Sequence, residues 1–237
     1  MLQLDNIHCK RGTGEQQFTV SISDFSLARG EMLAITGRSG SGKSTVLEIL
    51  GLVLRPDRLG CFVWSDLQGI DLDLAALWRS NSDACLSRIR ASRIGFVLQT
   101  GGLLPYLNVS RNIALTRRLL GLKPESERID ELVEALGIGH LLARKPYQLS
   151  IGERQRVSIA RALAHDPRLF LADEPTSALD PHLADEVFDL MIAAVQHSGS
   201  AAVIVTHDHE RVRALGLREI RSRLVHDAAH DCSVFEG

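Results

Sequence analysis

A glycine-rich run near residue 40 has the composition and spacing of a phosphate-binding loop. It has the sequence GRSGSGKST and fits the pattern GxxxxGK[ST]. Glycine lets backbone N–H groups approach an anion closely, and a following helix adds the positive end of its dipole. The run therefore predicts binding of ATP or GTP at Gly37, Arg38, Ser39, Gly40, Ser41, Gly42, Lys43, Ser44 and Thr45. We expect Lys43 to neutralise the β- and γ-phosphates and the Ser44 hydroxyl to join the shell of a Mg²⁺ ion.

Two carboxylates follow an apolar run at residues 169–172 (LFLA). We expect Asp173, at the tip of a strand, to reach the Mg²⁺ ion through water. We expect Glu174 to act in catalysis by orienting and polarising the water that attacks the γ-phosphate. A strand that ends in Asp-Glu is common and is usually only solvated, so both assignments depend on the phosphate loop that precedes it.

Short apolar runs predict the elements that position these residues. A strand is expected at 33–36, directly before the glycine-rich loop, and apolar residues recur with helical spacing at 46–50. A further strand is expected at 94–98, and the continuous apolar runs at 169–172 and 203–205 are typical of parallel strands buried on both faces. We predict an α/β phosphate-loop NTPase core with a mostly parallel sheet flanked by helices. An antiparallel β part lies at its N-terminus, and a helical subdomain is inserted.

Composition argues against several classes of protein. The 237 residues carry 27 basic and 29 acidic side chains, a formal net charge of −2. This balance argues against an electrostatic binder of nucleic acid. The opening residues (MLQLDNIHCKRG) contain no apolar block, so we expect no signal peptide. The strongest apolar runs, 47–54 and 201–205, are shorter than the roughly 20 residues that span a bilayer. Four well-separated cysteines without a CxxC pair favour reduced thiols in the cytosol.

The segment 149–163 (LSIGERQRVSIARAL) has two interpretations. Ser150 is a good helix N-cap, and Val157, Ala160 and Leu163 form an apolar face, as in any capped helix that packs on a core. The free first turn of such a helix is also an anion site. Together with the phosphate loop, the segment resembles the signature of ATP-binding-cassette (ABC) ATPases, whose usual form is LSGGQ or LSGGE followed by RV-IARAL.

The resemblance to ABC ATPases covers about residues 1–225. It includes Gln99 in GFVLQ, Asp180 at the end of SALD and His207 in VTHD. The resemblance implies that Gln99 senses Mg²⁺ and couples to a membrane subunit. It also implies that Asp180 links two sites across a dimer and that His207 holds the γ-phosphate as a catalytic residue.

One departure from the family pattern lies in the signature itself, where Ile151 replaces the first glycine. In the family this stretch, which includes Ser150 and Gly152 here, contacts the ATP of a partner subunit through backbone N–H groups. A β-branched residue restricts the backbone and adds bulk. We therefore hypothesise that hydrolysis is weakened or asymmetric.

A second departure concerns the base of the nucleotide. The family usually stacks adenine on an aromatic residue near the N-terminus, and the aligned position here is Lys10 or Arg11. Arg11 could stack through its planar guanidinium, or Phe18 could substitute for the missing aromatic residue. The sequence leaves both options open.

The resemblance also implies how the chain is divided. A single cassette would occupy residues 1–225, followed by a short C-terminal tail at 226–237. Within the cassette, a RecA-like core would comprise about 1–98 and 165–225. The helical subdomain would comprise about 99–164.

Partners and cofactors follow from the same resemblance. An ABC ATPase subunit binds ATP and Mg²⁺ and dimerises head to tail with itself or with a related subunit. Its closure drives membrane subunits on separate chains, from the cytoplasmic face of the inner or plasma membrane. The stretches 95–99, 103–105 and 153–155, with Val109 and Asn112, are similar to the branch serving lipoprotein release and macrolide export.

The sequence leaves two alternatives open. One is a soluble ABC ATPase that acts on DNA or ribosomes, although such relatives carry long coiled coils or two cassettes in one chain. The other is a weakly hydrolysing ATP-binding module that regulates a partner, which Ile151 keeps open. The cluster of Arg88, Arg90 and Arg93 could touch acidic groups on a partner or lie on a solvated helix face.

Overall fold

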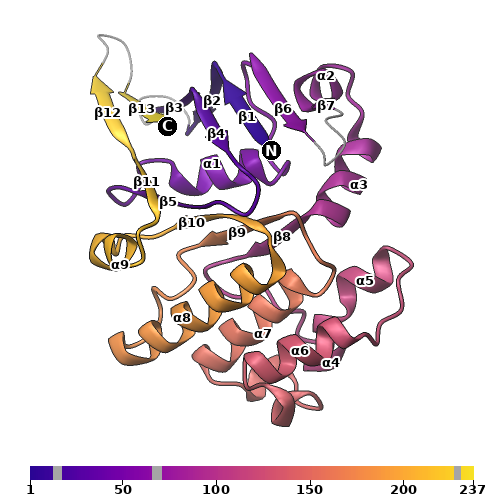
Figure 1. Cartoon of the computed structure of the whole chain (residues 1–237). Coiled ribbons are helices and arrows are strands. Elements are labelled where there is room, and N and C mark those ends of the chain that lie inside the picture. The colour runs from indigo at the N-terminus through magenta and orange to yellow at the C-terminus, as the bar shows by residue number, and fades with distance from the viewer. Residues whose placement is uncertain (13–17, 66–70, 227–230) are drawn as a thin grey trace. The chain divides into compact units, whose positions relative to one another are not determined.

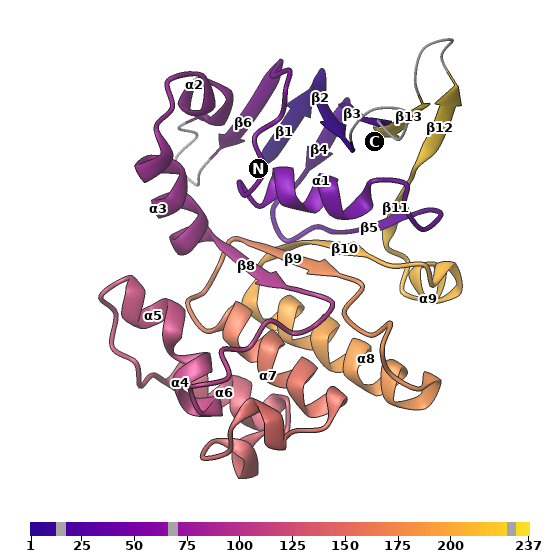
Figure 2. The same cartoon turned by 180° about the vertical axis from the view of Figure 1, so that it is seen from behind.

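The computed structural model describes residues 1–12, 18–65, 71–226 and 231–237, and these form two compact units (Figure 1). The first unit contains Met1–Arg90 and Val203–Gly237. The second unit contains Ala91–Ala202. Figure 2 shows the same elements from behind.

An antiparallel sheet in the first unit begins the fold. Its strand order is β4 (Phe25–Leu27), β1 (Leu2–Asp5), β6 (Cys61–Ser65) and β7 (Asp71–Asp73). Apolar and polar residues alternate along β1, so Leu2 and Leu4 are buried while Gln3 and Asp5 are exposed. This alternation places one face of the sheet against the core and leaves the other face in solvent.

A second sheet of the first unit joins distant parts of the sequence. Its strand order is β12 (Arg223–His226), β13 (Asp231–Glu236), β3 (Phe18–Ser23) and β2 (Ile7–Arg11). Strand β13 runs parallel to β3, and the other two pairs are antiparallel. The predicted antiparallel N-terminal part is therefore confirmed. Residues 231–236 lie in the segment that the sequence predicts as a tail, and in the structure they form β13.

Parallel strands of the first unit lead into the glycine-rich loop. Strand β5 (Met32–Thr36) pairs in parallel with β11 (Arg218–Arg221). Helix α1 (Lys43–Leu50) follows the loop and buries its apolar face. The other helices that begin in this unit are α2 (Leu74–Arg79), α3 (Asp83–Arg93) and α9 (His209–Ala214).

The second unit combines a parallel strand pair with helices. Strand β8 (Ile94–Val97) pairs in parallel with β9 (Leu169–Asp173), and their registers run from Ile94 beside Leu169 to Val97 beside Ala172. The α-helices are α4 (Val109–Ile113), α5 (Leu115–Leu119), α6 (Glu127–Ala135), α7 (Ile151–Leu163) and α8 (Pro181–Ser198). Two 3₁₀ turns, Gly139–Leu141 and Pro146–Gln148, precede α7, which packs against α4, α6, α8 and β8.

Strand β10 (Ala201–Val205) is buried along its whole length and has residues in both units. Its first N–H, from Ala201, bonds the Arg168 carbonyl just before β9 at 3.0 Å. The N–H of Thr206, just after the strand, bonds the Ile35 carbonyl of β5 at 3.1 Å. The four apolar runs that predicted strands thus form β5, β8, β9 and β10. The second unit is larger than the predicted helical subdomain at about 99–164, and those subdomain boundaries stay a prediction.

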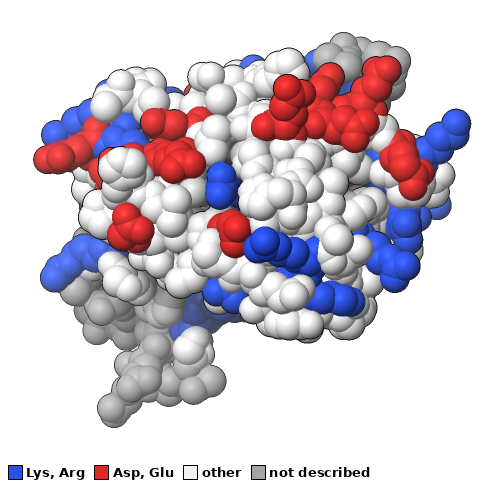
Figure 3. All heavy atoms as spheres, turned by 90° about the horizontal axis from the view of Figure 1, so that it is seen from below, with Lys and Arg blue, Asp and Glu red and all other residues white. Residues whose placement is uncertain are grey.

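The surface charges and the helices agree with the near-neutral net charge and the short apolar runs of the sequence. On the face shown in Figure 3, basic and acidic side chains both occur among uncharged ones. Among the described residues, no helix is long and apolar enough to cross a bilayer.

Candidate nucleotide site

The glycine-rich loop between β5 and α1 owes two of its glycines to steric constraints. Gly37 has a φ of 148°, and a Cβ at this position would collide with the Ser222 side chain. Gly42 caps α1 with a φ of 87°, and a Cβ there would collide with Val20 of β3. Both positions therefore require glycine, and the loop runs closely packed against its own unit.

Three features of this loop fit phosphate groups. The Lys43 side chain is buried, and its Nζ donates to the carbonyls of Gly37 at 3.0 Å and Arg38 at 2.9 Å. The buried Ser41 Oγ has no hydrogen-bond partner in the part of the chain that the structure describes. The first turn of α1 has neither a side-chain cap nor an acidic residue. A lysine ammonium, a hydroxyl without a partner among the described residues and a helix start without a side-chain cap together suit a polyanion.

The structure places His207 in the same unit as the glycine-rich loop. It is exposed and follows β10, whose end is held to β5 through the Thr206 N–H. The Asp208 N–H donates to Thr206 Oγ1 at 3.1 Å, and Asp208 Oδ1 caps α9 by accepting from the Arg211 N–H at 2.9 Å. The backbone on both sides of His207 is therefore held, while its side chain is exposed.

Oxygen donors suited to Mg²⁺ occur in both units. Ser44 is exposed in the first turn of α1, and Asp173 is half-buried at the end of β9. The described residues contain no cluster of three or more His, Cys, Asp or Glu side chains that could hold a metal ion by themselves. The side chains of Ser44 and Asp173 each offer an oxygen of a kind that Mg²⁺ accepts, since the ion is commonly bound by one or two carboxylates, water and the phosphates of a substrate.

A hydrogen-bonded chain in the second unit joins Gln99 to the Glu174 segment. Gln99 Nε2 donates to Ser177 Oγ at 3.1 Å, and Ser177 Oγ donates to the Glu174 carbonyl at 3.0 Å. Glu174 itself has a φ of 43°, a left-handed conformation that costs a non-glycine residue roughly 1–2 kcal/mol. The structure thus unites two predicted site residues through Ser177, which the sequence analysis did not single out.

One face of α7 holds the loop that follows Gln99. Gln155 Nε2 donates to the Gln99 carbonyl at 2.7 Å, and Ser158 Oγ donates to the Gly101 carbonyl at 2.8 Å. Arg161 donates to the carbonyls of Gly101 at 3.0 Å and of the next glycine at 2.7 Å, and its burial lowers its pKa. In the sequence, these contacts are signalled only by the spacing of three residues between Gln155, Ser158 and Arg161, which places them on one face of α7.

The signature segment forms the capped start of α7. Ser150 Oγ accepts from the Glu153 N–H at 3.2 Å, and the Ser150 N–H donates to Glu153 Oε2 at 2.7 Å. This backbone hydrogen bond is the main reason that the pKa of Glu153 is lowered. Gly152 is buried, and a Cβ there would lie 2.7 Å from Leu183 Cδ2 of α8, so this position must be small. Ile151 is 45% exposed and fits the first turn of the helix.

Asp180 has a local structural role in the described chain. Its Oδ1 accepts from the Leu183 N–H at 3.2 Å and caps α8. The hydrogen bonds that link Gln99, Ser177 and Glu174 run between those three residues. The structure therefore supports Asp180 as a helix cap, and its link across a dimer stays a prediction.

The two candidates for contact with adenine are cross-strand neighbours. Arg11 of β2 lies opposite Phe18 of β3. Arg11 Nη2 lies 3.5 Å from Glu48 Oε2 of α1, so its guanidinium already has a carboxylate partner. Phe18 is half-exposed, and a Cβ on Gly42 would lie 3.4 Å from its Cε2 atom, which places the ring beside the glycine-rich loop.

The glycine-rich loop lies between a buried strand and a helix without a side-chain cap, and an acidic residue ends a parallel strand. These features define the chain as a phosphate-loop nucleoside triphosphatase. Known proteins narrow this class. The sequence model of the ABC transporter family matches residues 20–177. The chain belongs to the ABC transporter family.

Relatives and solved structures agree with this assignment. The chain is 36% identical over 209 residues to the lipoprotein-releasing system ATP-binding protein LolD of Idiomarina loihiensis, which covers 87% of each sequence. The dimeric structure of MJ0796, a bacterial ABC transporter cassette, superposes with a TM-score of 0.77 at 32% identity. A post-hydrolysis state of the same cassette bound to ADP and Pi gives a TM-score of 0.75 at 33% identity. Both cover 93% of this chain and 94% of the other.

These similarities confirm the predicted fold and the predicted enzyme class. The chain has the α/β fold of an ABC ATPase cassette. It is an ATP-binding and ATP-hydrolysing subunit of an ABC transporter.

Proposed function

We propose that this chain hydrolyses Mg²⁺-bound ATP with the glycine-rich loop, Asp173, Glu174 and His207. The observation that carries the proposal is the state of the loop itself: its helix lacks a cap, Lys43 is buried over its carbonyls, and the buried Ser41 hydroxyl lacks a partner among the described residues. A loop without a ligand would leave the Ser41 hydroxyl and the helix start to bear their desolvation cost without compensation.

Binding of the phosphates falls to the residues of the loop. The backbone N–H groups of residues 37–45 surround the phosphates, and Lys43 provides the balancing charge. Ser44, Asp173 and Gln99 would hold the Mg²⁺ ion, which supplies charge neutralisation at the β- and γ-phosphates when bound. All three side chains offer oxygen atoms and are exposed or half-buried.

Hydrolysis requires a positioned water molecule and stabilisation of developing charge. Glu174 accepts a hydrogen bond from the water and orients it for in-line attack on the γ-phosphorus. The bond from that phosphorus to the bridging oxygen breaks, and the products are ADP and phosphate. Lys43 and His207 stabilise the charge on the transferred group. The left-handed backbone of Glu174 is the kind of strain that accumulates at functional sites.

Phe18 is the proposed contact for adenine. Its ring lies beside Gly42, whereas the guanidinium of Arg11 is engaged with Glu48. Phe18→Ala should weaken binding of ATP but not of inorganic triphosphate, by about tenfold for the loss of one stacking contact. Arg11→Ala is the matched change on the opposing strand, and a larger effect there would assign the contact to Arg11 instead.

The start of α7 is proposed to meet the ATP of a second ABC subunit. The N-cap Ser150 and the first helical residue Ile151 are exposed, in keeping with a dimeric arrangement such as that of MJ0796, and the buried Gly152 follows them. The exposed Ile151 side chain would then lie against the partner, which gives a physical reason for weak or asymmetric hydrolysis. If the partner is a second copy of this chain, hydrolysis would be weak at both sites. If the partner is a related chain, hydrolysis would be asymmetric.

Membrane subunits on separate chains are the proposed partners, at the cytoplasmic face of the inner or plasma membrane. The similarity to LolD supports a role in the branch that serves lipoprotein release and related envelope processes. Co-purification of the chain with integral membrane proteins would support this proposal. A chain that co-purifies only with ribosomes or DNA would favour the soluble alternative.

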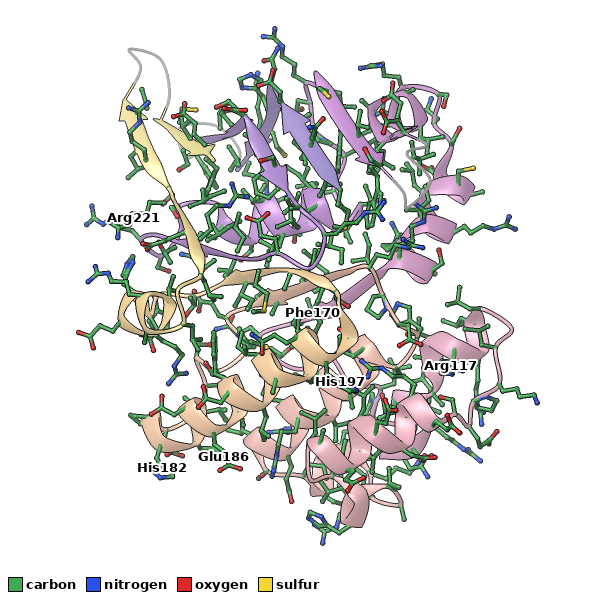
Figure 4. All side chains as sticks on the ribbon, viewed as in Figure 1. Arg117, Phe170, His182, Glu186, His197 and Arg221 are labelled. Carbon is green, nitrogen blue, oxygen red and sulfur yellow. The ribbon has the colours of Figure 1, made fainter. Side chains whose placement is uncertain are left out.

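Substitution of the proposed catalytic carboxylate tests the mechanism. Glu174→Gln keeps the size of the side chain but removes its basicity, so phosphate release should fall by about 100-fold. ATP binding, measured with a fluorescent analogue, should stay within about threefold. Glu186→Gln, on the exposed side of α8, is the matched control and should hydrolyse ATP at the wild-type rate (Figure 4).

Two outcomes would contradict this mechanism. Wild-type phosphate release from Glu174→Gln would remove Glu174 from its proposed role. A wild-type chain that binds ATP but releases no phosphate, alone or with its membrane subunits, would favour the regulatory alternative.

A further inference from the structure

A nearly buried carboxylate in β11 connects two parts of the first unit. Glu219 Oε1 accepts a hydrogen bond from Thr36 Oγ1 at 2.6 Å and lies 2.7 Å from His209 Nδ1. Its other oxygen, Oε2, accepts from Arg221 Nη2 at 2.7 Å. Only 15% of the Glu219 side chain is exposed, and Thr36 is fully buried. Three groups from three elements therefore converge on a single side chain.

This carboxylate is ionised over the whole physiological pH range. The hydrogen bond from Arg221 is the main cause, and those from Thr36 and His209 add to it, so that the pKa of Glu219 falls from 4.5 to about 2 although burial opposes the shift. The Thr36 hydroxyl has this carboxylate as its partner. Without Glu219, a buried hydroxyl in β5 would lose its acceptor.

Glu219 contacts two segments: the end of β5, just before the glycine-rich loop, and the start of α9, just after His207. Thr36 directly precedes Gly37, the first residue of the glycine-rich loop. His209 begins α9, and its backbone N–H donates to the carbonyl of His207 at 3.2 Å. Glu219 thus fixes the base of the loop through Thr36 and the His207 segment through His209.

We propose that Glu219 is a positioning residue that holds the His207 segment in register with the glycine-rich loop. The proposal rests on the function proposed above, in which His207 meets the γ-phosphate bound by that loop. Glu219 itself touches neither the phosphates nor the attacking water. It acts by fixing the geometry of two groups that do, and small displacements of such groups are costly in rate.

An ordinary ion pair on the same strand provides a contrast. Arg218, the residue before Glu219, has its Nε atom 2.7 Å from Glu31 Oε1. Glu31 also accepts from the Ala28 N–H at 2.6 Å, so its partners lie away from both the loop and His207. An isosteric change at Glu31 therefore removes a comparable charge without touching the proposed connection.

The test compares Glu219→Gln with Glu31→Gln in the full chain. For Glu219→Gln we expect kcat for ATP hydrolysis to fall about tenfold while the Kd for ATP stays within about threefold. Hydrogen exchange, measured without nucleotide, should accelerate at the amides of residues 206–209. Glu31→Gln should leave kcat, Kd and this exchange unchanged. Equal kcat and equal exchange in Glu219→Gln and wild type would overturn the proposal.

A second variant guards against simple loss of folding. His209→Ala removes a half-exposed partner of Glu219 and should reproduce the fall in kcat. In combination with Glu219→Gln it should add little, because both changes weaken the same connection at residue 219. Full additivity of the two effects would contradict the proposal. Failure of the proposed function would show separately, as wild-type hydrolysis in Glu174→Gln.

Discussion

Two helix N-termini of this molecule are candidate phosphate sites, and they are built in opposite ways. Helix α1 starts at a left-handed glycine without a side-chain cap, and the buried Lys43 lies over the preceding loop. Helix α7 starts at Ser150 with a complete capping box, in which Glu153 returns a hydrogen bond to the Ser150 N–H. The start of α1 offers backbone N–H groups and the Lys43 ammonium to a ligand. The start of α7 is capped by the carboxylate of its own Glu153.

The difference separates binding from stability. A helix start without a cap gains its hydrogen bonds from a bound anion, so the structure around α1 should respond strongly to nucleotide. A helix start with a capping box is stable by itself and carries a negative charge near its first turn. We infer that α1 determines ATP affinity in one chain, whereas α7 is a rigid surface that modulates turnover with a second subunit.

The largest expected effect is on ATP affinity at the uncapped helix. Lys43→Met keeps the aliphatic stem but removes the ammonium, so the Kd for ATP should rise at least about 100-fold, or about 2.7 kcal/mol. Without nucleotide, the free energy of unfolding should change by less than about 1 kcal/mol. Fluorescent-nucleotide titration and urea denaturation measure the two quantities, with the exposed Lys123→Met as the control. A Kd within threefold of wild type would end the distinction between the two helix starts.

The capping box of α7 should affect stability rather than affinity. Glu153→Gln should lower the free energy of unfolding at pH 7 by about 1 kcal/mol and leave the Kd for ATP unchanged. Since the folded state lowers the pKa of Glu153, its stabilising contribution is fully present above the unfolded pKa of about 4.5. It is lost as pH falls through the lower folded value.

Urea denaturation across this pH range measures the effect. The difference in unfolding free energy between wild type and Glu153→Gln should shrink as the pH falls below 4.5. Glu134→Gln, on the exposed side of α6, should show a smaller and nearly constant difference. A difference for Glu153→Gln that grows on acidification would contradict the role of the ionised carboxylate.

The smallest expected effect is on turnover at the first turn of α7. Ile151→Gly removes the exposed side chain and should raise ATP turnover about threefold, or about 0.6 kcal/mol. The increase should be visible only at protein concentrations that permit dimers, because the side chain faces a second subunit in our proposal. Ile151→Val keeps the β-branch and should hydrolyse ATP at the wild-type rate. An unchanged or lower rate for Ile151→Gly would refute the hypothesis.

Local signals explain most of what the sequence predicts correctly. The runs at 33–36, 169–172 and 203–205 are continuous and apolar because both faces of these strands are buried, and each forms a strand. Gly37 and Gly42 belong to a fixed pattern because a Cβ at either position meets another side chain. Such constraints act within a few residues or impose a residue type, so they are visible in one sequence.

Contacts between distant segments explain what the sequence analysis missed. Ser158 and Arg161 are ordinary polar residues of a helix until the carbonyls of a loop about 60 residues away meet them. Those acceptors are backbone atoms, which every residue has, so their identity carries no signal. Glu219 lies in a short strand with two arginines, a sequence that suggests exposure to solvent. Only the parallel pairing of β11 with β5 brings Thr36 to it. The pairing of β13 with β3 was missed for the same reason.

The parallel pairing of β13 with β3 imposes an order on the maturation of this enzyme. Ser23 of β3 bonds Glu236 of β13, and these residues are 213 positions apart. On the ribosome, β3 is therefore made long before the strand that covers its edge. Val20 of this same β3 stands behind Gly42 of the glycine-rich loop. The sheet that supports the nucleotide loop is thus completed only when Glu236 has been made, 213 residues after Ser23, and ATP reaches a finished site only then.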